Sequence, residues 1–174
     1  MIRILAILAI TVVLCSSCAH RYYIVRHAEK EAPSGSGTMM TNDPSLSEAG
    51  KVRALVLRDQ LKNRHVRYIY STNTIRTIST VTPLSEATGV KIQLYNSKDS
   101  LDQFVSWLKS IRKGSVVIAG HSNTVDDIVN RLCNTVMISG DLPDSQYDNM
   151  YIVTYRGRKI RFRTHKYGYP SNPE

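Results

Sequence analysis

Cysteine is scarce in this chain, and long apolar runs are missing. Of the three cysteines only Cys133 lies far from the N-terminus, which excludes an internal disulfide framework. The longest apolar run, residues 4–14, is too short for a permanent transmembrane helix, which needs about 20 residues. The chain also has no internal repeat. With 174 residues it has room for one domain, whose core must come from packing alone.

Residues 1–18 have the pattern of an export signal. Arg3 precedes the apolar run, and the small residues of CSSC (15–18) follow it, as in secretory signals. Cys18 resembles the lipid-modified cysteine of bacterial lipoproteins, and cleavage after Ala19 is the alternative. We therefore expect export to the periplasmic side of a bacterial membrane and attachment there through lipidated Cys18.

Basic residues outnumber acidic ones, with 23 Lys and Arg against 14 Asp and Glu, so the formal net charge is +9. A basic surface attracts anions, but by itself it does not distinguish phosphate esters, nucleic acid and anionic lipid. Because the sequence has no recognisable nucleic-acid-binding module, we expect no nucleic-acid partner.

Short β-rich runs alternate with helical patterns up to an irregular tail at residues 167–174. The expected strands are 22–25, 66–70, 90–95 and 115–119, the expected helices are 47–62, 73–88, 100–112 and 123–133, and a closing hairpin joins 150–155 to 159–163. The alternation predicts one domain, residues 20–166, folded as a three-layer α/β/α sandwich around a mostly parallel sheet. We expect the buried face of the first helix to be formed by Ala49, Val52, Leu55, Val56 and Leu61, and Phe104 and Trp107 to lie in the core.

Two arginines and two histidines come shortly after the ends of predicted strands. Arg26 and His27 follow the first strand, and His121 follows the strand 115–119 after Gly120. Arg76 lies in the first turn of the helix that follows the second strand. In open α/β sheets ligands bind beyond the carboxyl ends of the strands, so these side chains should meet at one edge. Guanidinium groups bind phosphate with paired hydrogen bonds and would repel a metal cation. Metal-binding motifs such as HExxH are also missing from the sequence. We therefore expect a phosphate site without metal or other cofactor, in which a histidine is the nucleophile.

Four segments resemble, in the right order, the motifs of the histidine phosphatase superfamily, also called phosphoglycerate mutase-like. They read IVRHAEK (24–30), DPSLSEAG (43–50), STNTIRT (71–77) and GHSNT (120–124), with alanine where the family usually has glycine after the histidine. The resemblance, to a short subgroup with an RHAEK motif, implies the phosphoglycerate mutase-like fold. It also implies that His27 is the phosphorylated nucleophile, that Arg26, Arg76 and His121 form the phosphate pocket, and that no metal takes part.

The sequence leaves the proton donor open. Asp99 and Asp102 follow the third strand, where many members of this family place an acid, and Glu29 is a further alternative. A donor must reach the departing alkoxide with a hydrogen bond. Aspartates beside Ser100 also favour the start of a helix without any catalytic role.

The resemblance implies a phosphatase that hydrolyses phosphate monoesters through a covalent phosphohistidine on His27. Phosphotransfer between substrate positions, as in a mutase, and a non-catalytic anion-binding lipoprotein of the same fold are the alternatives. The chain is too short to carry a large lid. We therefore expect a pocket that water can enter and a small or exposed phosphorylated substrate.

Overall fold

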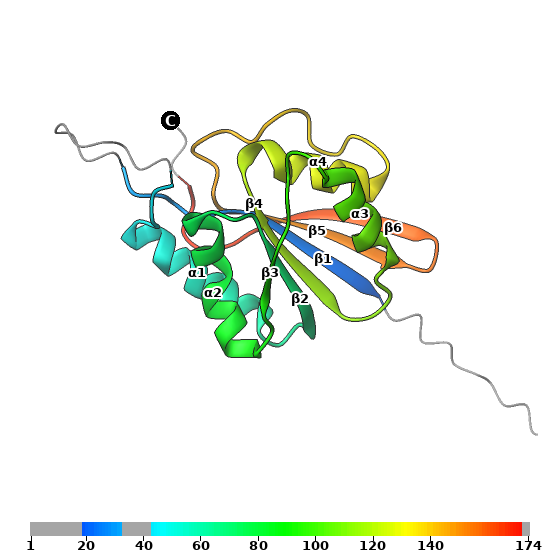
Figure 1. Ribbon diagram of the computed structural model, residues 1–174, viewed down its shortest axis with the longest axis horizontal. Helices are drawn as coiled ribbons and strands as arrows, with labels where there is room; N and C mark the ends of the chain where they lie inside the picture. Colours follow the sequence, from blue (N-terminus) through cyan, green and yellow to red (C-terminus); the bar gives the residue numbers. More distant parts are fainter. Residues whose placement is uncertain (1–18, 33–42, 172–174) are drawn as a thin grey trace, which may run out of the picture.

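The computed structural model describes residues 19–32 and 43–171 (Figure 1). The predicted export signal and Cys18 lie outside the described residues, as do residues 172–174 of the predicted tail. Within the described part of the chain, no helix is long and apolar enough to cross a membrane.

A six-stranded sheet forms the middle layer, in the order β3-β2-β4-β1-β5-β6. The strands are β1 (His20–Arg26), β2 (Val66–Ser71), β3 (Ile92–Leu94), β4 (Ser115–Gly120), β5 (Asn149–Arg156) and β6 (Lys159–Lys166). The helices are α1 (Glu48–Leu61), α2 (Ile75–Thr88), α3 (Leu101–Ser110) and α4 (Ser122–Cys133). The first four strands are parallel, whereas β5 and β6 run antiparallel to their neighbours. Helices α1 and α2 cover one face and α3 and α4 the other, which confirms the predicted α/β/α sandwich (Figure 1).

The central strand β4 shows how the sequence builds this core. Every residue of β4 is buried, as its continuous apolar run predicts for a strand covered on both faces. Successive side chains point to opposite faces of a strand. Val116 and Ile118 accordingly pack into the cluster beneath α3 and α4, and Val117 and Ala119 into the cluster beneath α1 and α2.

Helix α1 has the predicted length but buries a partly different face. Ser47 caps it as expected, its hydroxyl accepting a hydrogen bond from the third residue of the helix. Of the predicted buried face, Leu61 is confirmed, being 2% exposed, and Val56 packs partly against the core, but the prediction was wrong for Ala49, Val52 and Leu55, which are exposed. Arg53 occupies the inner face instead and is only 3% exposed, because the Glu29 carboxylate and two backbone carbonyls satisfy its guanidinium group there.

The prediction that Trp107 lies in the core was also wrong. The residue is 47% exposed. Its indole lies edge-on against Tyr68 and Tyr70, at the side of the sheet that ends with the three-residue strand β3. Because β3 is the last strand described on this side, no further described element covers the outer surface of Trp107.

Candidate active site

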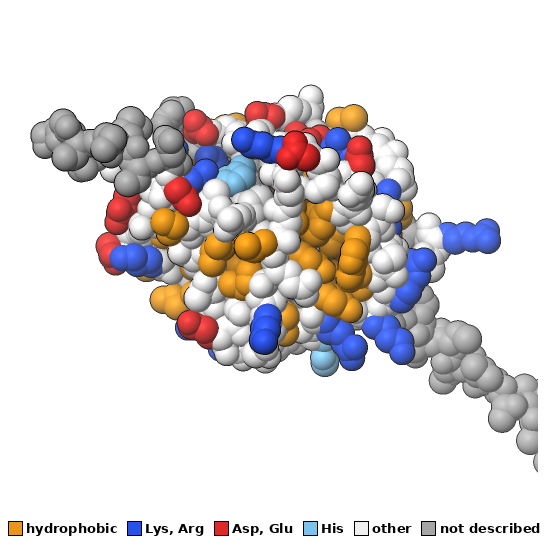
Figure 2. Space-filling view, viewed as in Figure 1, with side chains coloured by type: hydrophobic (Ala, Val, Ile, Leu, Met, Phe, Trp, Pro, Cys, Tyr) orange, Lys and Arg blue, Asp and Glu red, His pale blue; other side chains and the backbone are white. Residues whose placement is uncertain are grey.

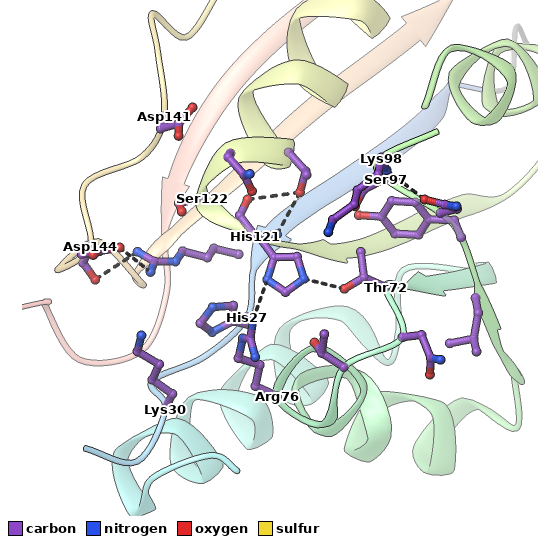
Figure 3. A pocket seen from close by; sticks show the side chains of 18 residues that line it. His27, Lys30, Thr72, Arg76, Ser97, Lys98, His121, Ser122, Asp141 and Asp144 are labelled. Carbon is purple, nitrogen blue, oxygen red and sulfur yellow. Dashed lines mark hydrogen bonds and ion pairs between the residues drawn. The ribbon is translucent and has the colours of Figure 1, made fainter. Parts of the chain in front are cut away.

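Two histidines meet where the neighbouring strands β1 and β4 end. The backbone N–H of His27, directly after β1, donates to the carbonyl of Gly120 over 2.9 Å. His121 follows Gly120, and the two imidazole ring centres lie 5.5 Å apart (Figure 3). The prediction that these residues meet at one sheet edge is therefore confirmed.

Gly120, the last residue of β4 before His121, leaves room for two hydroxyl groups because it has no side chain. A Cβ atom at this position would lie 2.8 Å from both the Thr124 hydroxyl and the Tyr95 hydroxyl. The Thr124 hydroxyl also accepts a hydrogen bond from the His121 N–H over 2.9 Å. This bond fixes His121 as the residue that precedes α4, so that its ring is held over the end of the sheet.

His27 is held as a neutral imidazole with a free ring nitrogen. Its Nδ1 lies 2.8 Å from the Ala28 carbonyl oxygen, which can only accept, so Nδ1 carries the proton and Nε2 has the lone pair. The ring is 4% exposed. Burial, reinforced by the positive charges of Arg26 and Arg76, lowers the pKa of His27 to about 3. The imidazole is consequently unprotonated and nucleophilic at neutral pH.

A chain of hydroxyl groups orients His121. Its Nδ1 lies 3.4 Å from Nη2 of Arg76, which can only donate, so Nδ1 accepts and Nε2–H donates to the Thr72 hydroxyl over 2.9 Å (Figure 3). The Thr72 hydroxyl in turn donates to that of Thr77 over 3.0 Å. Burial, followed by the charges of Arg76 and Arg26, lowers the pKa of His121 to about 4.

Arg76 is oriented by the carboxylate of Asp43, a residue for which the sequence predicted no role. Asp43 accepts from Nη1 of Arg76 over 3.0 Å and from the backbone N–H of Ile75, at the start of α2, over 2.7 Å. One carboxylate thus fixes both the arginine and the helix terminus beside it, while Nη2 of Arg76 faces His121. In the sequence, Asp43 is only the first residue of the DPSLSEAG motif (43–50), which does not indicate a contact with Arg76.

Arg26 is buried and is held by the loop that precedes β5. Its Nη1 donates to the carbonyls of Pro143 and Asp144 over 2.8 and 3.0 Å, and its Nη2 pairs with the Asp144 carboxylate over 3.2 Å. The guanidinium carbon lies 4.4 Å from the ring centre of Tyr147. The Nε atom is buried and has no hydrogen-bond partner among the described residues.

These side chains line an open pocket of about 1140 Å³. Lys30 and Lys98 add positive charge to its walls, and the first turn of α4 reaches it at Ser122 and Asn123 (Figure 3). The N–H groups of a helix start attract anions. Among residues 19–32 and 43–171, no group of three or more His, Cys, Asp or Glu side chains is placed to hold a metal ion. The pocket is therefore suited to a tetrahedral oxyanion.

The three acids considered as proton donors do not line this pocket. Asp102 pairs with Arg131 over 2.7 Å, and Glu29 pairs with Arg53. Asp99 accepts from the Asn96 amide in an exposed turn, although the neighbouring residues 96–98 reach the pocket.

Two other acids do line the pocket, Asp141 and Asp144. Both belong to the irregular segment between α4 and β5, where no periodic pattern marks them in the sequence. Thr72 and Tyr147, which contact His121 and Arg26, were also missed by the sequence reading.

The fold and the site together define an α/β protein with an oxyanion pocket built around a neutral histidine. The model of the histidine phosphatase superfamily (branch 1) matches residues 22–97. Phosphoserine phosphatase 1 from Hydrogenobacter thermophilus is 36% identical over 69 residues, which are 40% of this chain and 33% of that protein. The chain thus spans about a third of the length of the curated relative that it matches.

Solved structures with the same fold cover nearly the whole domain. The protein histidine phosphatase SixA, solved in complex with tungstate, has a TM-score of 0.63 and 14% identity, over 84% of this chain and 96% of that one. A phosphoserine phosphatase from Entamoeba histolytica has a TM-score of 0.60 and 11% identity, over 87% and 98%. These neighbours share the fold of this chain, and the family model matches its first half, from the start of β1 to the pocket residues after β3.

Proposed function

We propose that this protein is a phosphatase that hydrolyses phosphate monoesters, without a metal, through a phosphohistidine on His27. The observation that carries the proposal is the neutral imidazole of His27, whose Nδ1–H is held by the Ala28 carbonyl and whose Nε2 is free. Arg26 and Arg76 lie beside it with the positive charge that a phosphoryl group requires, and His121 becomes a donor when the bound anion draws a proton onto its Nδ1.

The reaction has two displacements at phosphorus. In the first, the Nε2 lone pair of His27 forms the N–P bond while the ester P–O bond breaks, and the leaving oxygen takes the electron pair and a proton. In the second, water attacks phosphorus and gives a proton to the carboxylate left by the first step, the N–P bond breaks, and its electron pair returns to Nε2. Arg76 holds the phosphoryl oxygens through both steps, joined by His121 once its Nδ1 carries a proton, and the Nδ1–H bond of His27 to the Ala28 carbonyl keeps the His27 ring aligned.

The proton for the leaving oxygen comes, in this proposal, from an acid on the loop before β5. Asp141 and Asp144 are the carboxyl groups among the described residues that line the pocket. They replace Asp99 and Asp102 as candidate donors because hydrogen-bond reach is the first requirement. A substrate with a good leaving group, such as p-nitrophenyl phosphate, should need this acid far less than an alkyl phosphate does.

The relatives support hydrolysis rather than phosphotransfer between substrate positions. The curated relative and the two structural neighbours are all phosphatases by name. The open pocket gives water a route to the phosphohistidine. We propose a small or exposed phosphorylated substrate for the same reason, and place the chain in the short subgroup with an RHAEK motif.

A substrate panel with two matched histidine variants tests the proposal. We expect wild-type turnover of phosphate monoesters in the presence of chelator, competitive inhibition by tungstate, and an acid-labile phosphoprotein after rapid quenching. His27→Ala should abolish all turnover, whereas His165→Ala, in the exposed strand β6, should leave it unchanged. A wild-type protein that binds tungstate but hydrolyses no member of the panel would instead be the non-catalytic anion-binding alternative.

We also propose that residues 1–18 act as a lipoprotein signal and that lipid on Cys18 attaches the domain to the periplasmic side of a bacterial membrane. The basic start, the apolar run and the small residues before Cys18 support this. Labelled palmitate should be incorporated by wild type and not by Cys18→Ser. Recovery of unlabelled wild type from the soluble periplasmic fraction would refute lipid attachment and favour cleavage after Ala19.

A further inference from the structure

Positive charge is concentrated at the end of the sheet opposite the pocket. Parallel strands begin at one edge and end at the other, so the residues around the starts of β1, β2, β3 and β4 share this edge with the turn between β5 and β6. We call this surface the basic end. It consists of Arg21, Arg64, Arg67, Lys91, Arg112, Lys113, Arg156, Arg158 and Lys159.

Strand register places these residues together. Arg21 pairs with Ser115, two residues after Lys113, and His20 pairs with Tyr155, which precedes Arg156. The Ser115 hydroxyl donates to the carbonyl of Arg64, and the Arg67 side chain passes over Gly114. All the side chains of the basic end are exposed except Arg21, which is half-buried.

The basic end is not neutralised by the described part of the chain. None of its residues forms an ion pair with another described residue. The acids in the last turns of α1 and α2 are Asp59 and Glu86, and Asp59 is already paired with Arg58 and Lys62. Figure 2 shows Lys and Arg side chains gathered at the lower right, where β1 begins in Figure 1, and most acidic side chains along the top and left.

The described chain begins at this same end. Strand β1 starts at His20, so a single residue, Ala19, separates it from Cys18. Each residue of extended chain spans at most about 3.6 Å. A lipid on Cys18 would therefore hold the basic end within about 10 Å of the headgroups, which is roughly one Debye length at physiological salt. Charges at that distance act on an anionic membrane surface.

We propose that the basic end is a contact surface for anionic lipid headgroups, and that it holds the domain with its pocket facing away from the bilayer. The orientation rests on the membrane attachment proposed above, whereas the lipid contact rests on the described charges. The six residues of β4 cross the sheet from the basic end to the pocket, a distance of about 20 Å. The phosphate bond that is cleaved thus belongs to a molecule free in the compartment or extending well above the headgroups.

Lysine labelling within one molecule tests this orientation. The full chain, purified from membranes of the expressing cells, is reconstituted into vesicles of phosphatidylcholine with or without phosphatidylglycerol. An amine-acylating reagent is then added, and its rate at each lysine is read by mass spectrometry. Lys113 and Lys159 lie at the basic end, and the exposed Lys98 at the pocket is the internal reference.

We expect labelling of Lys113 and Lys159, relative to Lys98, to be at least about threefold slower on the anionic vesicles than on the neutral ones. About 0.5 M salt should remove the difference, because screening shortens the range of the attraction to a few ångströms. Arg158→Glu should weaken the protection. Lys51→Glu makes the same charge change in the first turn of α1, at the pocket end, and should leave the protection intact.

Other outcomes separate this inference from membrane attachment itself. Flotation with both vesicle types but equal labelling of all three lysines would overturn the lipid contact and leave attachment standing. Flotation with anionic vesicles alone would support the contact and refute the lipid anchor. Protection of Lys98 in place of Lys113 would overturn the proposed orientation, because the pocket would then face the bilayer.

Discussion

Replacing Arg53 with methionine should destabilise the fold more than any other single arginine change on α1. The guanidinium group binds the Glu29 carboxylate through Nε and Nη2 at 2.6 to 3.0 Å. It also donates to the carbonyls of Tyr167 and Tyr169 over 2.6 and 2.8 Å. Arg53→Met keeps the volume and apolar stem but leaves Glu29 and both carbonyls without their donor.

The magnitude follows from burial. The side chains of Arg53 and Glu29 are only 3% and 21% exposed, so the remaining carboxylate cannot regain full hydration. Breaking a buried ion pair by removing one partner costs about 3–5 kcal/mol. For a domain of this size that loss corresponds to a melting temperature lower by roughly 10 °C. Changing Glu29 to methionine as well should recover part of the loss, because no unpaired charge then remains.

Urea unfolding measures the change in the free energy of unfolding, and the fluorescence of Trp107, the only tryptophan of the chain, is the signal. Arg58→Met is the matched control, since Arg58 lies on the same helix and pairs with Asp59, but both side chains are at least 33% exposed. Its cost should stay below about 1 kcal/mol. If Arg53→Met and Arg58→Met unfold at the same urea concentration, the reasoning from burial is wrong.

Three further predictions concern the pocket. Asp144→Asn removes a negative charge that pairs with Arg26, so phosphate should bind more tightly and its inhibition constant should fall about threefold. Weaker phosphate binding would contradict this. Asp99→Asn, outside the pocket, serves as the control. Thr72→Val removes the acceptor of the His121 Nε2–H and should lower kcat about tenfold. Thr82→Val, which loses only a bond to the carbonyl one helical turn earlier, should not lower it, and equal kcat values for the two variants would exclude the orienting role. Because the folded pKa values of His27 and His121, about 3 and about 4, lie below the usual 6.5, the unfolded chain takes up protons first on acidification. Unfolding titrations should therefore show a loss of about 3 kcal/mol from these two histidines between about pH 7.5 and pH 5.5, and His27→Gln should lose about 1.4 kcal/mol less than wild type; an equal loss in that variant would refute the shifted pKa.

The meeting of the site residues could be predicted from the sequence because parallel strands all end at the same edge of a sheet. Arg26, His27 and His121 follow strands whose apolar patterns are unmistakable, and the parallel arrangement of those strands fixes a common edge. The length and cap of α1 were also predictable, since Ser47 is a strong local signal.

The parts that could not be predicted depend on contacts between distant segments. The buried face of α1 is decided by Arg53, whose carboxylate partner lies 24 residues away. A prediction from hydrophobic periodicity counts an arginine as solvent-exposed, and it therefore misplaces part of the buried face of α1. Asp144 reaches the pocket from an irregular loop that carries no periodic signal, 118 residues from its partner Arg26.

The last described residues bear on how the protein can be handled in experiments. The Ser171 hydroxyl accepts from the backbone N–H groups of Tyr147 and Asp148 over 2.9 and 3.0 Å. The Tyr147 ring lies 5.8 Å from that of His27. Ser171 is thereby anchored to the segment that carries Tyr147, so a purification tag or fluorescent reporter joined three residues further on should be tested for competition with bulky ligands.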